Sequence, residues 1–289
     1  MSGSVLYDAP GPRARRRNLA LTGVSVLGLA ALLWYVIHRF AVRGQWEAAK
    51  WRPFTTAKVW TEFILPGLVE TLLAAGTGMV LALAFGVVFA VGRLSEHRWV
   101  RYPAGVVVEF LRAVPLLLMI FFMFYGLPYL IDGPVPTFWA VVTGLTLYNG
   151  SVLAEAFRAG IRAVPRGQSE AGYGIGLRKS QVMRHILVPQ AARAMLPVIV
   201  SQLVVLLKDT ALGYIIAYPE LLERGVNELP ANYGNVVAAA LVVAVLYIAI
   251  NSTLTGVAGW LERRTRRIGR TAAAALTPEP AALAEKAGF

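Results

Sequence analysis

The sequence predicts an all-α, polytopic membrane protein with about six transmembrane helices. Of the 289 residues, 57% are hydrophobic and only 15% are charged, whereas soluble domains have roughly 45–50% apolar and about 25% charged residues. The apolar residues also gather in stretches of about 20 residues or more, the length that a helix needs to cross a bilayer. A large soluble core does not account for these two observations.

Six stretches meet the length requirement. The first, Leu19–Ala41, follows four arginines and is longer than the apolar region of a signal peptide, so we expect a retained anchor. We expect kinks at Pro66, Pro115 and Pro128, because proline removes a backbone donor and clashes with the preceding turn. The five later spans are expected at roughly Phe63–Gly92, Tyr102–Ile131, Pro136–Phe157, Ala194–Ala217 and Asn235–Leu261.

The basic residues predict which side of the membrane each loop occupies. Six spans place both termini on one side, and twenty lysines and arginines fall on that side against six on the other. Cytoplasmic loops carry the excess of lysine and arginine, so we expect a multi-pass protein of the plasma membrane with both termini in the cytoplasm. The formal net charge of +12 then reflects membrane orientation, and no nucleic-acid partner is expected.

These patterns divide the chain into four parts. Residues 1–18 form a cytoplasmic N-terminal tail, and residues 19–62 form an extra first helix with an external loop. Residues 63–261 form the transmembrane domain, which contains a cytoplasmic loop at 158–193. Residues 262–289 form a cytoplasmic tail of low complexity, which we expect to be disordered. The chain has no cysteine and three scattered histidines, so neither a disulfide nor a metal site is expected.

One basic segment, Glu170–Pro189, interrupts the apolar sequence with EAGYGIGLRKSQVMRHILVP. Ser169 is expected to cap a short helix that begins at the next residue. Gly174 and Gly176 permit a sharp turn, after which a second helix is expected over Lys179–Ile186, ending before the proline. Two short helices joined by a turn form a knob, a shape suited to a socket on a partner.

The spacing in this segment resembles the signature loop of ABC importer permeases, which reads E-A-A, three residues, G, nine residues, I-x-L-P. Here Gly172 replaces the second alanine and Val188 replaces leucine. Glycine costs about 1 kcal/mol relative to alanine inside a helix, so the first helix is expected to be looser. The resemblance implies a docking loop for an ATPase, formed by Glu170, Ala171, Gly172, Gly176, Arg178, Lys179, Ile186 and Pro189.

Longer stretches are similar to the polar amino-acid branch of these permeases, namely 101–128, 147–172 and 206–222. The N-terminal VLYDAPGPRARR, followed by an extra span, is similar to a permease of the actinobacterial glutamate importer. The resemblance implies the type I ABC importer permease fold and import of a polar amino acid, glutamate in particular.

The same resemblance implies three protein partners in the membrane lipid. They are a cytoplasmic ABC ATPase dimer, a second permease that is homologous but not identical, and an extracytoplasmic amino-acid-binding protein. This chain contains no P-loop G-x-x-x-x-G-K-[ST]. ATP and Mg are therefore expected on the ATPase, and no catalytic residue or bound cofactor is expected in this transport subunit.

Charged residues inside the expected spans are costly in lipid and indicate a transport pathway. Lys208 and Asp209 point about 100° apart on a helix and need not pair, since the lysine can extend its ammonium toward the membrane surface. Glu109 and Arg112 are spaced to pair on one face. Alternatively, Arg112 binds a substrate carboxylate. The pathway candidates are Arg112, Asn149, Glu155, Lys208, Asp209 and Thr210.

Two other classes of protein remain as alternatives to an importer permease. A helical channel or an ion-gradient-coupled amino-acid transporter also places charges in the membrane, although the signature spacing of the knob is expected only of an importer. A structural membrane scaffold leaves the intramembrane Lys208 and Asp209 without a role.

Overall fold

The computed structural model describes residues 11–276, with side-chain surroundings as far as residue 260 except residue 258, and this part of the chain is helical without any strand. The all-α prediction is thereby confirmed. The α-helices are α1 (Pro12–Val42), α2 (Ala48–Trp51), α3 (Ala57–Val59), α4 (Leu65–Leu94), α5 (Arg98–Ala113), α6 (Leu116–Phe121), α7 (Pro128–Ile131), α8 (Thr137–Ala163), α9 (Arg166–Gly174), α10 (Lys179–Val182), α11 (Val188–Asp209), α12 (Leu221–Glu223), α13 (Leu229–Tyr233) and α14 (Val236–Leu276).

Short segments of tighter or wider helix join several of these elements. The tighter 3₁₀ segments are η1 (Arg52–Thr55) and η5 (Thr210–Ile216). The wider π-helical turns are η2 (Trp60–Ile64), η3 (Phe122–Gly126), η4 (Met183–Leu187) and η6 (Arg224–Glu228).

Each of these π-helical turns ends two residues before a proline, at Pro66, Pro128, Pro189 and Pro230. Proline lacks an N–H group and its ring clashes with the carbonyl four residues earlier. A wider turn accommodates both effects and lets the helix continue. The expectation that a helix ends before Pro189 is therefore wrong, because one helical run continues from Lys179 to Ile216.

Four helices in the described part of the chain are long and apolar enough to cross a membrane. They are Pro12–Val42, Ala57–Leu94, Lys179–Ile216 and Val236–Val257. They account for the expected first, second, fifth and sixth spans, although the fifth begins fifteen residues before the expected Ala194.

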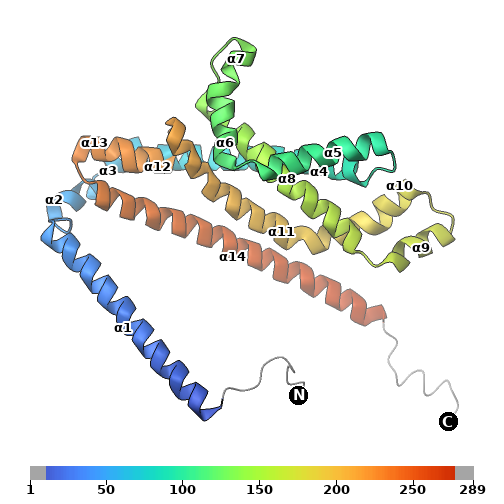
Figure 1. The fold of residues 1–289 in the computed structure, drawn as a ribbon, viewed down its shortest axis with the longest axis horizontal. Helices are drawn as coiled ribbons and strands as arrows, with labels where there is room; N and C mark the ends of the chain where they lie inside the picture. The colour runs from blue at the N-terminus through green and yellow to red at the C-terminus, as the bar shows by residue number, and fades with distance from the viewer. Residues whose placement is uncertain (1–10, 277–289) are drawn as a thin grey trace.

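The expected third span is not one straight helix. It consists of Arg98–Ala113 and Leu116–Ile131, which are bent by 101° relative to each other. The residue before a proline is restricted to extended backbone, and Val114, which precedes Pro115, has φ −79° and ψ 129°. The expected kink is thus a sharp corner, after which α6 packs against α8 and α7 projects from the other helices (Figure 1).

The expected fourth span is α8, which has 27 residues but is too polar to be counted with the apolar helices. It packs against α4, α5, α6 and α11, and its residues Leu145 and Leu153 are fully buried. Because other helices surround it, α8 can carry polar side chains that lipid would not tolerate. The six expected spans thus comprise four apolar helices, one bent pair and one enclosed helix.

The main core lies between α4 and α8. Ala74, Ala75 and Ala82 of α4 are buried against the α8 leucines, and small side chains of this kind let membrane helices approach closely. A second core joins α3 and η2 to α12, α13 and the start of α14 through Val59, Ile64, Leu221, Leu229 and Val243. This second core lies at the end of the bundle opposite α9 and α10 (Figure 1).

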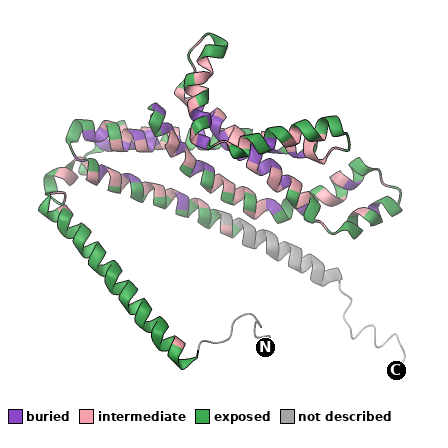
Figure 2. Cartoon of the chain, in the orientation of Figure 1, coloured by how far each residue is buried: buried purple, intermediate pink, exposed green. Residues whose placement is uncertain are grey.

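The two ends of the described chain depart from the expected tails. Helix α1 begins at Pro12, a residue favoured in the first turn of a helix, so the tail expected at 1–18 becomes helical there. None of its residues is buried, and it lies apart from the bundle (Figure 2). Helix α14 continues to Leu276, so it extends into the tail for which disorder was expected from residue 262. The first proline after α14 is Pro278, and residues 1–10 and 277–289 lie outside the described part.

Candidate functional site

The first candidate site is the knob predicted from the basic segment, formed by α9, a turn, α10 and η4. Helix α9 begins at Arg166, after Pro165, rather than at Glu170 as expected. The hydroxyl of Ser169 donates to the carbonyl of Arg166 at 2.8 Å inside the helix, so Ser169 is not its cap. Gly176 makes the turn with φ +83°, a left-handed conformation that glycine adopts at little cost.

Gly172 allows the two helices of the knob to meet. It is buried, and a Cβ atom added there would lie 2.8 Å from Cδ1 of Ile186 and 3.0 Å from Cγ2 of Val182. The glycine that replaces the expected alanine therefore holds α9 close to α10 and η4. Ile186 is accordingly half-buried inside the knob.

The other predicted docking residues lie on the outside of the knob. Glu170 and Ala171 of α9 are exposed, as are Arg178, Lys179 and Pro189. Arg178 precedes α10, and its backbone N–H donates to Oε1 of Gln181 at 2.8 Å, which caps that helix. An exposed face supported by an internal contact is an arrangement that can dock into a partner.

Lys179 joins the knob to the loop after α4, because its Nζ lies 2.7 Å from Oε1 of Glu96. The hydrogen bond and the positive charge of Lys179 lower the pKa of the Glu96 carboxyl below its ordinary value. Both side chains are well exposed, 72% for Glu96 and 42% for Lys179. An exposed ion pair contributes little to stability. The main effect of this contact is therefore to fix the position of the knob relative to the loop after α4.

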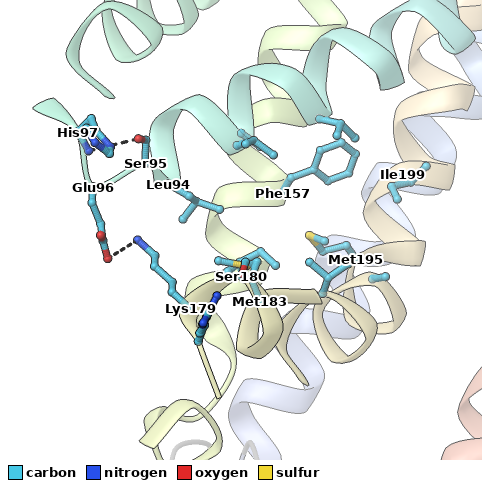
Figure 3. A pocket seen from close by; sticks show the side chains of 17 residues that line it. Leu94, Ser95, Glu96, His97, Phe157, Lys179, Ser180, Met183, Met195 and Ile199 are labelled. Atoms are coloured by element: carbon cyan, nitrogen blue, oxygen red, sulfur yellow. Dashed lines mark hydrogen bonds and ion pairs between the residues drawn. The ribbon is translucent and has the colours of Figure 1, made fainter. Parts of the chain in front are cut away.

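A cavity of about 720 Å³ lies between the knob and the bundle, behind the Glu96–Lys179 pair (Figure 3). Its walls are mostly apolar and include Phe157 of α8 and Met195 of α11. The cavity leaves space beside the first turns of the Lys179–Ile216 helix. Farther along, the same helix packs against α4 and α8, where Ala191, Leu206 and Leu207 are buried in the main core.

A network of charged residues joins α4, α5 and α8 near the same end. Arg93 contacts Glu109 at 3.1 Å and Glu155 at 2.9 Å, and Arg158 also pairs with Glu155. The expected pair of Glu109 with Arg112 is therefore wrong, because Arg93 reaches Glu109 from the neighbouring helix. Arg112 is exposed and adds its positive charge close to Glu155.

Three of the predicted pathway residues lie between α8 and α11. The Asn149 amide is fully buried, accepts a hydrogen bond from Gln202 and lies against the Asp209 carboxylate. Thr210 is also fully buried, and its hydroxyl donates to the carbonyl of Leu207 at 2.7 Å. The hydroxyl hydrogen of Thr210 is therefore used in a hydrogen bond within its own helical run. Asn149 and Asp209, in contrast, form a polar contact between α8 and α11.

Lys208 lies away from that contact, in a groove between α11 and α14. The groove has a volume of about 820 Å³. Its polar lining comes from Lys208 and from α14, which contributes an amide and three hydroxyls. The lining residues are Lys208, Ala211, Leu222, Tyr247, Ile248, Asn251, Ser252, Thr255, Gly256 and Gly259. The structure therefore does not bring Arg112 and Lys208 together.

Arg93, Glu96, Asn251 and Ser252 are absent from the residues predicted from the sequence. Arg93 and Glu96 directly follow the expected span Phe63–Gly92, and nothing in the sequence shows which helix they reach. Asn251 and Thr255 did carry a usable signal, because they are polar residues four positions apart inside an apolar span, a spacing that places them on one helix face.

The sequence also matches known transport proteins. Residues 82–267 match the family described as binding-protein-dependent transport system inner membrane component. The glutamate transport system permease protein GluD of Corynebacterium glutamicum is 43% identical over 225 residues, 77% of this chain and 82% of that protein. The probable glutamine ABC transporter permease protein GlnP of Bacillus subtilis is 36% identical over 70% of this chain and 93% of its own length.

Solved structures agree with these relatives. A crystal structure of an amino acid ABC transporter with histidines has a TM-score of 0.67 and 26% identity, covering 71% of this chain and 95% of that chain. The MetNI methionine ABC transporter in an inward-facing conformation has a TM-score of 0.58 at 17% identity over 72% of this chain and 97% of that chain, a likeness of fold. The chain therefore belongs to the inner-membrane components of binding-protein-dependent transport systems, and it is an amino-acid ABC importer permease, a transport subunit with the type I fold rather than an enzyme.

Proposed function

We propose that this permease carries an acidic amino acid, glutamate, into the cytoplasm, and that a cytoplasmic ATPase dimer drives it through the knob. One observation carries the proposal: a single helical run, Lys179–Ile216, joins the knob to Lys208. The 29 residues between Lys179 and Lys208 correspond to roughly 40 Å of helix at about 1.5 Å per residue. A displacement of the knob is therefore transmitted directly to the groove between α11 and α14.

The docking role is supported by the shape of the knob. Its exposed residues Glu170, Ala171, Arg178 and Lys179 lie over the buried contact that Gly172 makes. Closure of the ATPase dimer around ATP and Mg would push on this face. The cavity next to Met195 and Phe157 allows the long helix to respond, and the Arg93 network holds α4, α5 and α8 together while it moves.

The orientation of the chain follows from its charge. The 158–193 segment that contains the knob, the 93–101 loop and the two terminal tails carry twenty of the basic residues, against six on the opposite face. Because cytoplasmic segments carry this excess, we place the knob and both termini in the cytoplasm. The ends of the spans near Glu220 then face outward, toward an extracytoplasmic amino-acid-binding protein.

The choice of glutamate is supported by the relatives and by the positive charge of the groove. GluD is a glutamate permease by name, and the 29% identical GltK of Escherichia coli, which matches 70% of this chain and 93% of its own length, is a glutamate/aspartate import permease by name. Lys208 supplies a cation in the groove. A second, homologous permease subunit would complete the translocation pathway beside this one.

ATP hydrolysis by the reconstituted complex tests this assignment. The complex would contain both permeases, the ATPase and the binding protein in proteoliposomes, with single amino acids supplied in turn. Glutamate should stimulate hydrolysis and enter the vesicles at the lowest concentration, with aspartate next and arginine without effect. Stimulation by arginine or histidine, but not by glutamate, would overturn the choice of an acidic substrate.

A further inference from the structure

We propose that the cavity between the knob and the bundle binds an acidic phospholipid of the cytoplasmic leaflet, with one acyl chain inside the cavity and the phosphate at Arg178. This inference goes beyond amino-acid import, because it assigns a lipid site to the place where the knob meets the membrane part of the chain. It shares with the proposed function only the orientation that puts the knob in the cytoplasm.

The polar side chains of this cavity are gathered at its mouth. They come only from 95–97, directly after α4, and from 178–180, at the start of the Lys179–Ile216 run. The rest of the lining is apolar and includes Phe157 of α8 and Met195 and Ile199 of α11. Figure 3 shows these three side chains on the side away from Glu96. A polar mouth with an apolar interior is the arrangement that an amphiphile requires.

The position of the cavity matches the boundary between acyl chains and head groups in a bilayer. Two helices that are apolar enough to cross a membrane meet there, because Ala57–Leu94 ends and Lys179–Ile216 begins beside the mouth. The α4 side of the cavity faces outward, since the lining residues Val87 and Val91 are 52% and 65% exposed. An acyl chain can therefore enter the cavity sideways from the bilayer.

The interior of the cavity favours a hydrocarbon chain over water. A buried water molecule needs two to four polar partners, whereas the interior side chains are hydrocarbon and thioether groups. An empty cavity forfeits the dispersion contacts of its walls, and an acyl chain would restore them. The volume of about 720 Å³ lies in the range of small-molecule sites, about 300–1,000 Å³.

The charge of the mouth selects an anionic head group. Its charged residues are two cations, Arg178 and Lys179, and one carboxylate, Glu96. Lys179 is paired with Glu96, whereas Arg178 is exposed and forms no ion pair with the other described residues. A guanidinium binds phosphate oxygens through paired N–H groups, and basic pockets between membrane helices on the cytoplasmic side suit anionic lipid head groups. A zwitterionic head group would instead place its own cation near Arg178.

Photo-crosslinking in the complete transporter tests this site. The probe is phosphatidylglycerol that carries a diazirine near the end of one acyl chain, and the crosslinked residues of this chain are identified by mass spectrometry. We expect crosslinks at Phe157, Met195 or Ile199 in the interior. Unlabelled phosphatidylglycerol should compete with the probe. Phosphatidylcholine should compete poorly, as should glycerol phosphate, which has no acyl chain.

Filling the cavity should exclude the acyl chain. Ala192 lines the cavity and is exposed, so the ring of Ala192→Phe enters the cavity without replacing a packed side chain. The crosslinks should fall by about tenfold or more, because the added volume overpacks the site. Ala194→Phe is the matched control, since residue 194 is also exposed on α11 but does not line the cavity. Ala192→Leu serves as a second variant if the first does not assemble.

The head-group contact is tested at Arg178. Arg178→Gln should raise the phosphatidylglycerol concentration for half-competition about fivefold, the loss expected for one cation near an anionic lipid. Arg178→Lys should restore most of the competition. Arg166→Gln is the control and should leave competition unchanged, because residue 166 is exposed on α9 and does not line the cavity.

The lipid site and the proposed import fail differently in these experiments. A complex that imports glutamate but shows no crosslink in the interior, or crosslinks that Ala192→Phe leaves intact, overturns the lipid site. Equal competition by phosphatidylcholine and phosphatidylglycerol overturns the selection of an anionic head group. A complex that imports no glutamate but gives the expected crosslinks overturns the choice of substrate and leaves the lipid site intact.

Discussion

The Nζ atom of Lys179 lies 2.7 Å from Oε1 of Glu96, so the knob is joined to the loop after α4 as well as to its own long helix. A push on the knob can therefore reach the bundle by two routes. One route is the continuous run Lys179–Ile216, and the other is α4, which packs along α8. Because the pair is exposed, its loss should change the coupling of ATP hydrolysis to transport rather than the stability of the fold.

Reversing the charges of this pair tests the second route. Glu96→Lys should lower the uptake per ATP hydrolysed, because two cations then repel across the contact. The double variant Glu96→Lys with Lys179→Glu should restore it, and the melting temperature should change little in either variant. The matched control is the exposed pair Lys58–Glu62, 3.9 Å apart on α3 and η2, whose reversal should leave coupling unchanged. Equal coupling in the single and double variants would contradict this role.

The pH dependence of that pair has a definite sign. The pKa of Glu96 is lowered from its ordinary value of 4.5 by the hydrogen bond and charge of Lys179. The contribution of the ion pair is therefore present above pH 4.5 and is lost only as the pH falls through the lowered value. Coupling that depends on this pair should be constant between about pH 5 and 8. A steep change across that range, abolished by Glu96→Gln, would contradict the ion pair.

The turn of the knob predicts a large effect of a small substitution. Gly176→Ala forces an L-residue into a left-handed conformation, which costs about 1–2 kcal/mol, although no atom lies within 4 Å of the added Cβ. We expect reduced ATPase stimulation with normal membrane insertion. Gly174→Ala is the control, because that position is equally open but has no positive φ. Equal losses in both variants would show that backbone conformation is not the cause.

The contact at Gly172 predicts a dependence on size. Gly172→Ala requires small shifts of the flexible end of Ile186 and of Cγ2 of Val182 and gains about 1 kcal/mol of helix propensity, so transport should be nearly unchanged. Gly172→Leu cannot be accommodated against Ile186 and Val182, and overpacking of this kind costs about 1–3 kcal/mol. ATP-driven uptake should fall while the chain remains in the membrane. Similar uptake by the two variants would contradict the packing.

The buried Glu220 predicts a pH-dependent stability. It is fully buried and accepts hydrogen bonds from the N–H groups of Leu222 and Glu223 and from Tyr247. Burial raises its pKa above the ordinary value of 4.5. Its contribution to stability is therefore greatest below pH 4.5 and declines as the pH rises through the raised value.

Glu220→Gln, which does not titrate, should remove that part of the pH dependence. The melting temperature of the detergent-purified complex, recorded from pH 4 to pH 8, measures it, and Glu62→Gln at an exposed site is the control. The absolute stability of Glu220→Gln should be lower, because an amide accepts fewer of these hydrogen bonds. Parallel melting curves for wild type and Glu220→Gln would contradict the raised pKa.

The sequence was most informative where local chemistry decides the structure. Apolar length predicted the helices around α4, α11 and α14, and the glycine at 176 predicted the turn of the knob, because only one residue type suits that backbone. The proline at 115 predicted a break but not its angle of 101°, since the angle depends on how α6 packs against α8. The proline at 189 was misread, because a π-helical turn absorbs it.

The candidate sites were predictable only in part, because side chains from distant helices complete them. Arg93 meets Glu109 and Glu155 across three helices, so the nearer Arg112 was chosen wrongly from its i, i+3 spacing. Lys208 was predictable as an intramembrane cation. Its neighbours in the groove, Asn251 and Ser252, come from a helix more than forty residues later, and no local pattern shows that the two helices lie together.

The measurement that tests the central claim most directly is ATP-driven amino-acid uptake by a complex with Glu170→Arg. Glu170 is exposed on α9 and lies outside the internal contact of the knob, so the variant should insert and assemble its membrane part normally. The account predicts that wild-type proteoliposomes take up substrate only with ATP and the binding protein, and that Glu170→Arg loses most of this uptake. Unchanged uptake by the variant, or uptake driven by an ion gradient without ATP, would contradict it.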